Sequence, residues 1–140
     1  SQHHNLNNWH WTEKTFTEWT DTKLKELLTF DKDIDNHKIS ITVETIKGES
    51  FKYIRKNKMH SSFDYKIVLN FKIAGECHVE GIINIEPFVD EDYDDWNFET
   101  KIKNIKTLQA QEIEFANKIV SRKFLKPLFE QFQSEFEKQE

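Results

Sequence analysis

The central part of the chain alternates between apolar and polar residues. Apolar side chains occupy every second position from 63 to 73, and the positions between them are polar except for Val68. A period of two held this long is typical of a strand with one buried face and one wet face. Shorter stretches of the same kind predict further strands over residues 39–44, 51–56, 77–86 and 96–102.

Helical spacing appears on both sides of these strands. Over residues 12–30 apolar side chains recur at intervals of three and four, and Thr15 followed by Glu18 has the spacing of a capping box. Similar intervals from residue 116 to residue 136 predict a long C-terminal helix. Pro127 interrupts this helix, so we expect a kink or break there, because its ring clashes with the preceding turn and its nitrogen donates no hydrogen bond.

The order of these elements predicts an α+β fold. It has an N-terminal helix, an antiparallel meander sheet of four to five strands, and a long C-terminal helix kinked or broken near Pro127, with the helices on one face of the sheet. Residues 1–11 are predicted to form a polar arm and residues 31–37 a charged turn. No repeat or composition shift divides the remainder, so residues 12–140 are predicted to form a single domain.

The composition favours a compact domain in spite of its high charge. Of 140 residues, 36% are hydrophobic and 32% are charged, but 12 Phe, 4 Trp and 3 Tyr supply large rings for a core. Only 3 Gly and 2 Pro are present, which argues against a flexible linker. The longest apolar run is Ile67-Val68-Leu69, too short to span a bilayer. Cys77 is the single cysteine, which excludes an intrachain disulfide and fits a reducing, cytosolic setting.

The sequence contains no common catalytic or ligand-binding motif. Walker, GxGxxG, HExxH and GxSxG patterns are all absent. Asp31, Asp33 and Asp35 begin like an EF-hand loop, but Asn36 takes the position of the required glycine and Thr42 that of the closing glutamate. The residues themselves therefore give little sign of an enzyme, which agrees with the family resemblance described below, and we expect no cofactor or metal.

Two other polar groups are better explained by ordinary roles. Cys77, His78 and His60 could form a thiol and imidazole set, but neighbours in a strand point to opposite faces, which favours structural roles. The acidic residues between 90 and 95 are expected to form a solvated loop.

The arm at residues 5–11, with the sequence NLNNWHW, is unusual because it places two Trp and a His in polar surroundings. In an extended chain Trp9 and Trp11 share one face and His10 lies on the other. Packing of both Trp onto the domain would explain the rings but accounts less well for the three Asn.

A second unusual stretch, residues 47–58, is basic in a chain whose net charge is −5. It holds the cations Lys47, Lys52, Arg55, Lys56 and Lys58 against one acid, Glu49. Cations gathered at a hairpin tip repel one another, but they steer the protein toward an acidic partner. Protection of an edge strand by lysine explains the charge equally well.

Together these stretches resemble the N-terminal domain of the activator of heat shock protein 90 ATPase, a co-chaperone family. The family pattern N-x-N-N-W-H-W matches residues 5–11 at every fixed position, and its R-K-x-K motif matches residues 55–58. The similarity extends over nearly the whole chain. Further agreements are Trp19, residues 24–28, residues 62–64, and Gly81 before residues 83–85.

The resemblance implies a regulator that binds the middle segment of the heat shock protein 90 chaperone and stimulates its ATPase. Arg55, Lys56 and Lys58 would contact and remodel the catalytic loop, which supplies an arginine to the ATP γ-phosphate. Hydrolysis would accelerate because an arginine stabilises charge that develops on the transferred phosphoryl group. The other residues that the resemblance assigns to partner contact are Glu49 and, in the arm, Asn5, Asn7, Asn8, Trp9, His10 and Trp11.

The same resemblance implies a cytoplasmic co-chaperone of protein folding and the stress response, and we expect a monomer that binds neither nucleic acid nor membrane. Longer family members add a linker and a second domain, and this chain ends at Glu140 without them, so we expect binding with weaker stimulation. The alternative is a single-stranded nucleic-acid-binding module in which Phe51 and Tyr53, within the basic hairpin 47–58, stack on bases. The negative net charge weighs against it.

Overall fold

The fold is an antiparallel sheet with three helices, seen in a computed structural model that describes residues 12–89 and 93–139. The strands are β1 (Glu13–Thr15), β2 (Phe30–Ile34), β3 (His37–Arg55), β4 (Lys58–Ala74), β5 (Val79–Val89) and β6 (Phe98–Ile102). The helices are α1 (Thr17–Leu27), α2 (Ala110–Ile119) and α3 (Arg122–Glu137), joined by the short 3-10 turns η2 (Tyr93–Asp95) and η3 (Ile105–Thr107). The predicted α+β class is confirmed, but the sheet has six strands where four to five were expected.

The two additional strands both pair with the same edge of β3. The main meander runs β3-β4-β5-β6, whereas β1 lies opposite residues 51–53 of β3 and β2 lies opposite residues 37–41. Both are short, and neither has a period of two with a buried face: β1 is exposed throughout and β2 at its three central residues. A hydrophobic pattern cannot reveal such strands, because they are held by ladder hydrogen bonds to β3.

These strands correct two predicted elements. The helix expected over residues 12–30 begins only at Thr17, and Phe16 occupies the N-cap without a side-chain hydrogen bond, so the Thr15–Glu18 capping box is wrong. The charged turn expected over residues 31–37 shrinks to Asp35 and Asn36, whose φ angles of 49° and 65° allow the chain to reverse between β2 and β3.

β3 is one strand of 19 residues, where two strands separated by Gly48 were expected. A bulge between Val43 and Thr45 shifts its register against β4, which is why the alternation looks interrupted in the sequence. Gly48 continues the strand, and a Cβ atom there would lie 2.1 Å from the carbonyl oxygen of Asp64. Glycine is therefore required by the close approach of β4.

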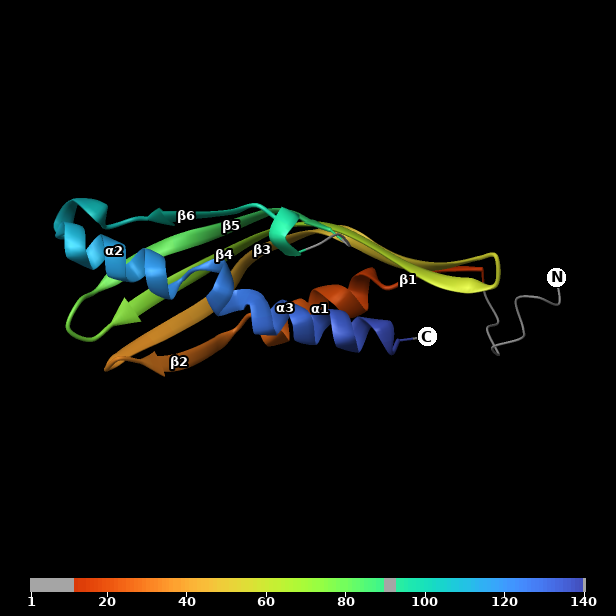
Figure 1. Ribbon diagram of the computed structural model, residues 1–140, viewed down its shortest axis with the longest axis horizontal. Helices are drawn as coiled ribbons and strands as arrows, with labels where there is room; N and C mark the ends of the chain where they lie inside the picture. Colours follow the sequence, from red (N-terminus) through yellow and green to blue (C-terminus); the bar gives the residue numbers. More distant parts are fainter. Residues whose placement is uncertain (1–11, 90–92, 140) are drawn as a thin grey trace.

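One face of the sheet is covered by all three helices and the other is open (Figure 1). The inward residues of β4 pack against α3 through aromatic rings: Phe63 lies 5.7 Å from Phe132 and 6.1 Å from Phe136, between ring centroids. Phe88 of β5 meets Trp96 edge-on at 4.5 Å. The core is thus built from the rings that the composition supplied.

The C-terminal helical region is divided, although not at the proline. α2 ends at Ile119 and α3 begins at Arg122, with Ser121 at its N-cap, so the break precedes Pro127. Pro127 lies inside α3, near the start of the helix. A kink of α3 at Pro127 stays a prediction. None of the helices in the described part of the chain has the length and apolar character needed to cross a membrane.

A tyrosine of the core provides a test of this packing. The Tyr65 side chain is 2% exposed, and burial raises the pKa of its hydroxyl to about 12. In the unfolded chain the hydroxyl titrates near its ordinary value of about 10, so above that pH the unfolded state binds fewer protons. The free energy of unfolding should then fall by about 1.4 kcal/mol per pH unit between roughly pH 10 and 12 from this group.

Tyr65→Phe should remove the part of the decrease in the free energy of unfolding at alkaline pH that comes from this hydroxyl. Urea unfolding of the parent and the variant at several pH values from 9 to 11 measures the two slopes. Tyr93, whose pKa is also raised by burial, is unchanged in both proteins and serves as an internal reference. Equal slopes would show that the Tyr65 hydroxyl is accessible to solvent in the folded protein.

Candidate functional site

The predicted basic motif forms the tip of the β3–β4 hairpin. Arg55 and Lys58 are opposite each other at the ends of the two strands, and Lys56 and Asn57 form a two-residue loop with φ angles of 52° and 61°. Positive φ at both positions is the backbone of a type I′ turn, which follows the twist of the strands. The chain therefore reverses over only two residues.

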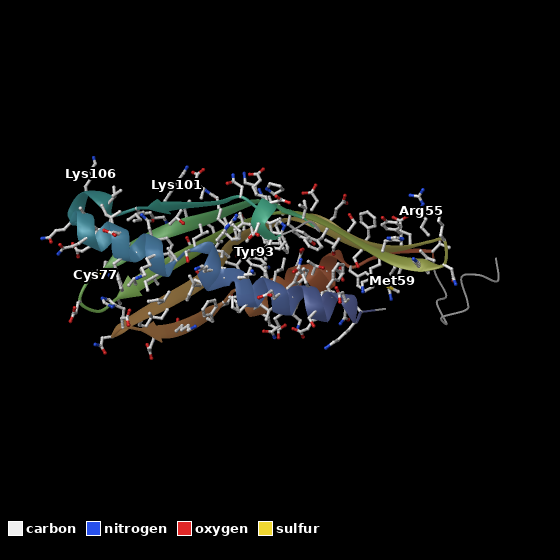
Figure 2. All side chains as sticks on the ribbon, viewed as in Figure 1. Arg55, Met59, Cys77, Tyr93, Lys101 and Lys106 are labelled. Atoms are coloured by element: carbon white, nitrogen blue, oxygen red, sulfur yellow. The ribbon has the colours of Figure 1, made fainter. Side chains whose placement is uncertain are left out.

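The cations of the tip are exposed and unpaired. Arg55, Lys56 and Lys58 are all exposed, and within the described ranges their side chains make no ion pair or hydrogen bond. Figure 2 shows Arg55 at one extremity of the molecule, where the hairpin extends beyond the helices. Three unneutralised cations are thus presented together at the end of a rigid ribbon.

The open face of the same hairpin carries like charges in direct opposition. We call the five cross-strand pairs on this face, from Lys47 to the tip of the hairpin, the charged ladder. Its pairs are Lys47–Lys66, Glu49–Asp64, Phe51–Ser62, Tyr53–His60 and Arg55–Lys58. Three of the five therefore set equal charges against each other, a destabilising arrangement in a sheet.

Glu49 shares this face with the basic tip but lies well away from it. It is six residues before Arg55 along β3, a separation of about 20 Å in an extended strand. Beside it, a shallow groove of about 520 Å³ is lined by both members of the first two ladder pairs and by Glu86 and Pro87 of β5. Lys66 makes an ion pair with Glu86 at 3.5 Å. Asp64 and Lys66 were not singled out from the sequence, because their place beside Glu49 depends on the register between β3 and β4.

Aromatic side chains separate the acidic and basic pairs of the ladder. Tyr53 stacks on His60 with 5.1 Å between ring centroids and 16° between planes, and Phe51 lies 6.0 Å from Tyr53. All three project from the open face, and Phe51 and Tyr53 are half-buried. Near the tip, the open face thus has an apolar area between an acidic pair, Glu49–Asp64, and a basic pair, Arg55–Lys58.

Lys52 does not belong to the exposed basic patch in which the sequence placed it. The side chain is fully buried on the helix-covered face of β3, and its ammonium group donates hydrogen bonds to the carbonyl oxygens of Phe136 and Gln139. The alternation of β3 explains the difference, since successive residues point to opposite faces. Four cations, Lys47, Arg55, Lys56 and Lys58, remain on the surface of this stretch.

Edge protection applies to some of these cations. β1 covers the edge of β3 only at residues 51–53, and β4 pairs with β5 only from Asp64 onward. Lys47 and Lys58 therefore lie on strand segments that are open on one side, where lysine also guards the edge.

The predicted arm lies outside the described residues, but its point of attachment is defined. The carbonyl oxygen of Thr12 accepts a hydrogen bond from the backbone nitrogen of Ile54 at 2.9 Å, and Ile54 directly precedes Arg55. The described part of the chain therefore begins beside the basic tip. Six predicted site residues belong to the arm and are not described: Asn5, Asn7, Asn8, Trp9, His10 and Trp11.

The thiol and imidazole side chains are not gathered into one site. Cys77 lies at the opposite end of the molecule from Arg55 (Figure 2), while His60 belongs to the ladder near the tip. Cys77 instead lies beside His37, with 3.7 Å between the Cys77 Sγ and the His37 Nε2. Burial, followed by the charges of Glu112 and Glu76, raises the pKa of the Cys77 thiol, which disfavours the nucleophilic thiolate.

The opposition of charges in the ladder predicts a gain in stability when one is removed. Asp64→Asn should raise the free energy of unfolding by roughly 0.2–1 kcal/mol, because it relieves the repulsion from Glu49. Denaturant unfolding at low and high salt measures the effect, and the gain should shrink as salt screens the charges.

The matched control is Asp31→Asn, which makes the same chemical change at an exposed strand position but removes an ion pair with Lys38 (3.5 Å). It should leave stability unchanged or slightly lower. If Asp64→Asn lost as much stability as the control, the conclusion that Glu49 and Asp64 repel each other would be contradicted.

Comparison with known proteins agrees with the resemblance seen in the sequence. The family model described as "Activator of Hsp90 ATPase, N-terminal" matches residues 13–140. The activator of 90 kDa heat shock protein ATPase homolog 2 of Bos taurus is 33% identical over 94 residues, which cover 62% of this chain and 35% of the relative. The human homolog 1 is 32% identical over 91 residues, covering 62% of this chain and 27% of the relative.

Structural comparison gives the same fold. The crystal structure of Aha-1 from Plasmodium falciparum superposes with a TM-score of 0.75 and 17% sequence identity, over 91% of this chain and 88% of that one. The chain spans about a third or less of the length of the curated relatives named above. With a family model matched from residue 13 to residue 140, the chain belongs to the family of Hsp90 ATPase activators, as a relative of their N-terminal domain.

Proposed function

We propose that this chain is a cytoplasmic co-chaperone domain that binds the middle segment of Hsp90 and stimulates its ATP hydrolysis by remodelling the catalytic loop. It acts on the ATPase of its partner and has no catalytic site of its own. The observation that carries the proposal is the exposed basic tip, whose side chains make no ion pair with any described residue, presented by a chain of the activator family.

The charge pattern of the hairpin supports a protein partner with acidic groups. Like-charged pairs directly opposite each other lower the stability of the free domain, and a partner that neutralises them gains what the free protein loses. The exposed cations steer the encounter, and their effect falls as salt rises. The aromatic pairs between Glu49 and Arg55 add apolar area to the same contact.

The proposed mechanism depends on the reach of the tip. The hairpin projects beyond the helices (Figure 1), so Arg55, Lys56 and Lys58 can enter a site that the rest of the domain cannot. There they hold the loop in the conformation that directs its arginine at the ATP γ-phosphate, and the arginine stabilises charge developing in the transition state. The binding energy of the domain is then used to populate an active loop conformation that is rare in the free chaperone.

The arm contributes to the same end of the molecule in this proposal. Residues 5–11 precede Thr12, which is hydrogen-bonded beside the tip, so both family motifs join the domain at one place. We propose that Trp9, His10 and Trp11 with their neighbouring Asn affect how the chaperone exchanges nucleotide.

The basic tip is tested by the double variant Arg55→Ala/Lys56→Ala. The concentration of domain needed for half-maximal stimulation of the Hsp90 ATPase should rise by roughly tenfold, because two cations of the contact are lost. Titration against the isolated middle segment over a salt series measures binding directly, and the variant should show a shallower salt dependence.

The control is Lys103→Ala/Lys106→Ala, which removes the same charge from two exposed positions, of which Lys106 lies at the other end of the molecule (Figure 2). It should stimulate as the parent does. If the tip variant stimulated equally well, or if both variants lost activity to the same degree, the role of Arg55 and Lys56 would be excluded. The matched family and relatives give no support to the single-stranded nucleic-acid alternative, and we do not adopt it.

A further inference from the structure

The most unusual side chain in the structure is a fully buried lysine close to the basic tip. Lys52 has no exposed surface, although a buried ammonium group is costly unless it is well satisfied. It lies on β3 three residues before Arg55, on the face that points toward the helices. Neither the charge pattern nor the family motif gives this residue a role.

The Lys52 ammonium group is held by the last turn of α3. It donates hydrogen bonds to the carbonyl oxygen of Phe136 in that turn and, at 2.5 Å, to that of Gln139, two residues past the end of the helix. It also lies over the rings of Phe136 and Phe16, 4.9 Å and 5.3 Å from their centroids. The last carbonyls of a helix lack partners within the helix and carry its negative partial charge, so a cation there satisfies both requirements.

This contact occurs where support for the hairpin ends. The β3–β4 ribbon continues past the C-terminal end of α3 (Figure 1). Beyond Lys52, its inward positions are Ile54 and Met59, of which Ile54 is buried and Met59 half-buried. The edge of β3 is supported as far as residue 53 by β1. Lys52 therefore ties the base of the projecting hairpin to the helix that anchors the core.

The end of α3 is itself firmly held. Phe136 stacks on Trp19 of α1 at 5.8 Å between centroids and on Phe132 at 5.6 Å. Lys23 of α1 makes an ion pair with Glu135 at 3.2 Å. The Phe136 carbonyl thus belongs to a turn that the core holds in place, and a long side chain bound to it at its far end restricts how the ribbon bends and twists.

We propose that Lys52 is a positioning residue, which sets the direction of the basic tip relative to the body of the domain. The effect on stimulation of the chaperone rests on the proposed function, whereas the effect of Lys52 on the direction of the hairpin does not. Removing the lysine alone leaves two carbonyl oxygens without this donor, which lowers the stability of the fold, although it also removes a buried charge that is costly to desolvate. The direction of the tip is therefore measured by distances in the folded protein, separately from stability.

The structural part is tested by distances between spin labels attached at Lys58→Cys and Lys25→Cys in a Cys77→Ser background, without any partner. Lys58 is at the tip and Lys25 is exposed on α1. Measured well below the variant's own unfolding midpoint, Lys52→Met should roughly double the width of the distance distribution. Lys52→Arg, which can still donate to both carbonyls, should keep the parent's width.

Lys23→Met is the matched control, since it removes a lysine that also binds the last turn of α3 but contacts no part of the hairpin. It should leave the distribution unchanged. If Lys52→Met does not fold, Lys52→Gln, which is uncharged and too short to reach both carbonyls, replaces it. A distribution as narrow as the parent's in the folded variant would overturn the proposal.

The functional part uses the unlabelled Lys52→Met protein with full-length Hsp90. Maximal stimulation of the ATPase should fall by about fivefold, while the concentration for half-maximal stimulation changes by less than about twofold, because a misdirected tip keeps its charge. Unchanged maximal stimulation with a broadened distribution would overturn this part alone. If the parent itself failed to stimulate, the proposed function would fail, while the spin-label distances would still decide the role of Lys52.

Discussion

The structure depends on the packing of aromatic rings between the inward face of β4 and β5 and the helix α3. Phe63 and Phe88 meet Phe132 there, and Trp96 closes the cluster against Phe88 and Phe129. Rings provide large buried areas and specific edge-on contacts, so a chain that is only 36% hydrophobic still builds a continuous core. This packing gives the long hairpin a rigid base.

Because stability comes from one face of the sheet, the other face can be used for recognition. The charged ladder carries Glu49 opposite Asp64 and Arg55 opposite Lys58, arrangements that a sheet selected only for stability would avoid. Gly48 belongs to the same part of β3 and lets β4 approach closely. The hairpin is thus well ordered by its covered face and unfavourably charged on its open face, which is the pattern expected of a binding surface.

Much of the architecture follows from local patterns in the chain. The alternation from Phe63 to Ile73 identifies β4 and its buried face, and the spacing of apolar residues identifies α1 and the C-terminal helices. The basic motif at 55–58 is recognisable as a charged hairpin tip, because three cations in four residues stand out in a chain of net charge −5. The short strands β1 and β2 cannot be predicted in this way, since their stability comes from pairing with β3. The break between α2 and α3 is not predicted either, because Pro127 points to a break further along the chain.

By itself, the sequence determined the α+β class, the period-two strands, the basic tip and the family, because each depends on residue types at short separations. The tertiary structure alone decided which charges share a face and which are buried. Glu49 meets Asp64 through the register of two strands, Thr12 comes beside Ile54 through the pairing that β1 extends, and Lys52 finds its carbonyls on a helix more than eighty residues away. A lysine in a basic stretch is read as exposed from sequence, and only the packing of α3 turns it into a buried contact.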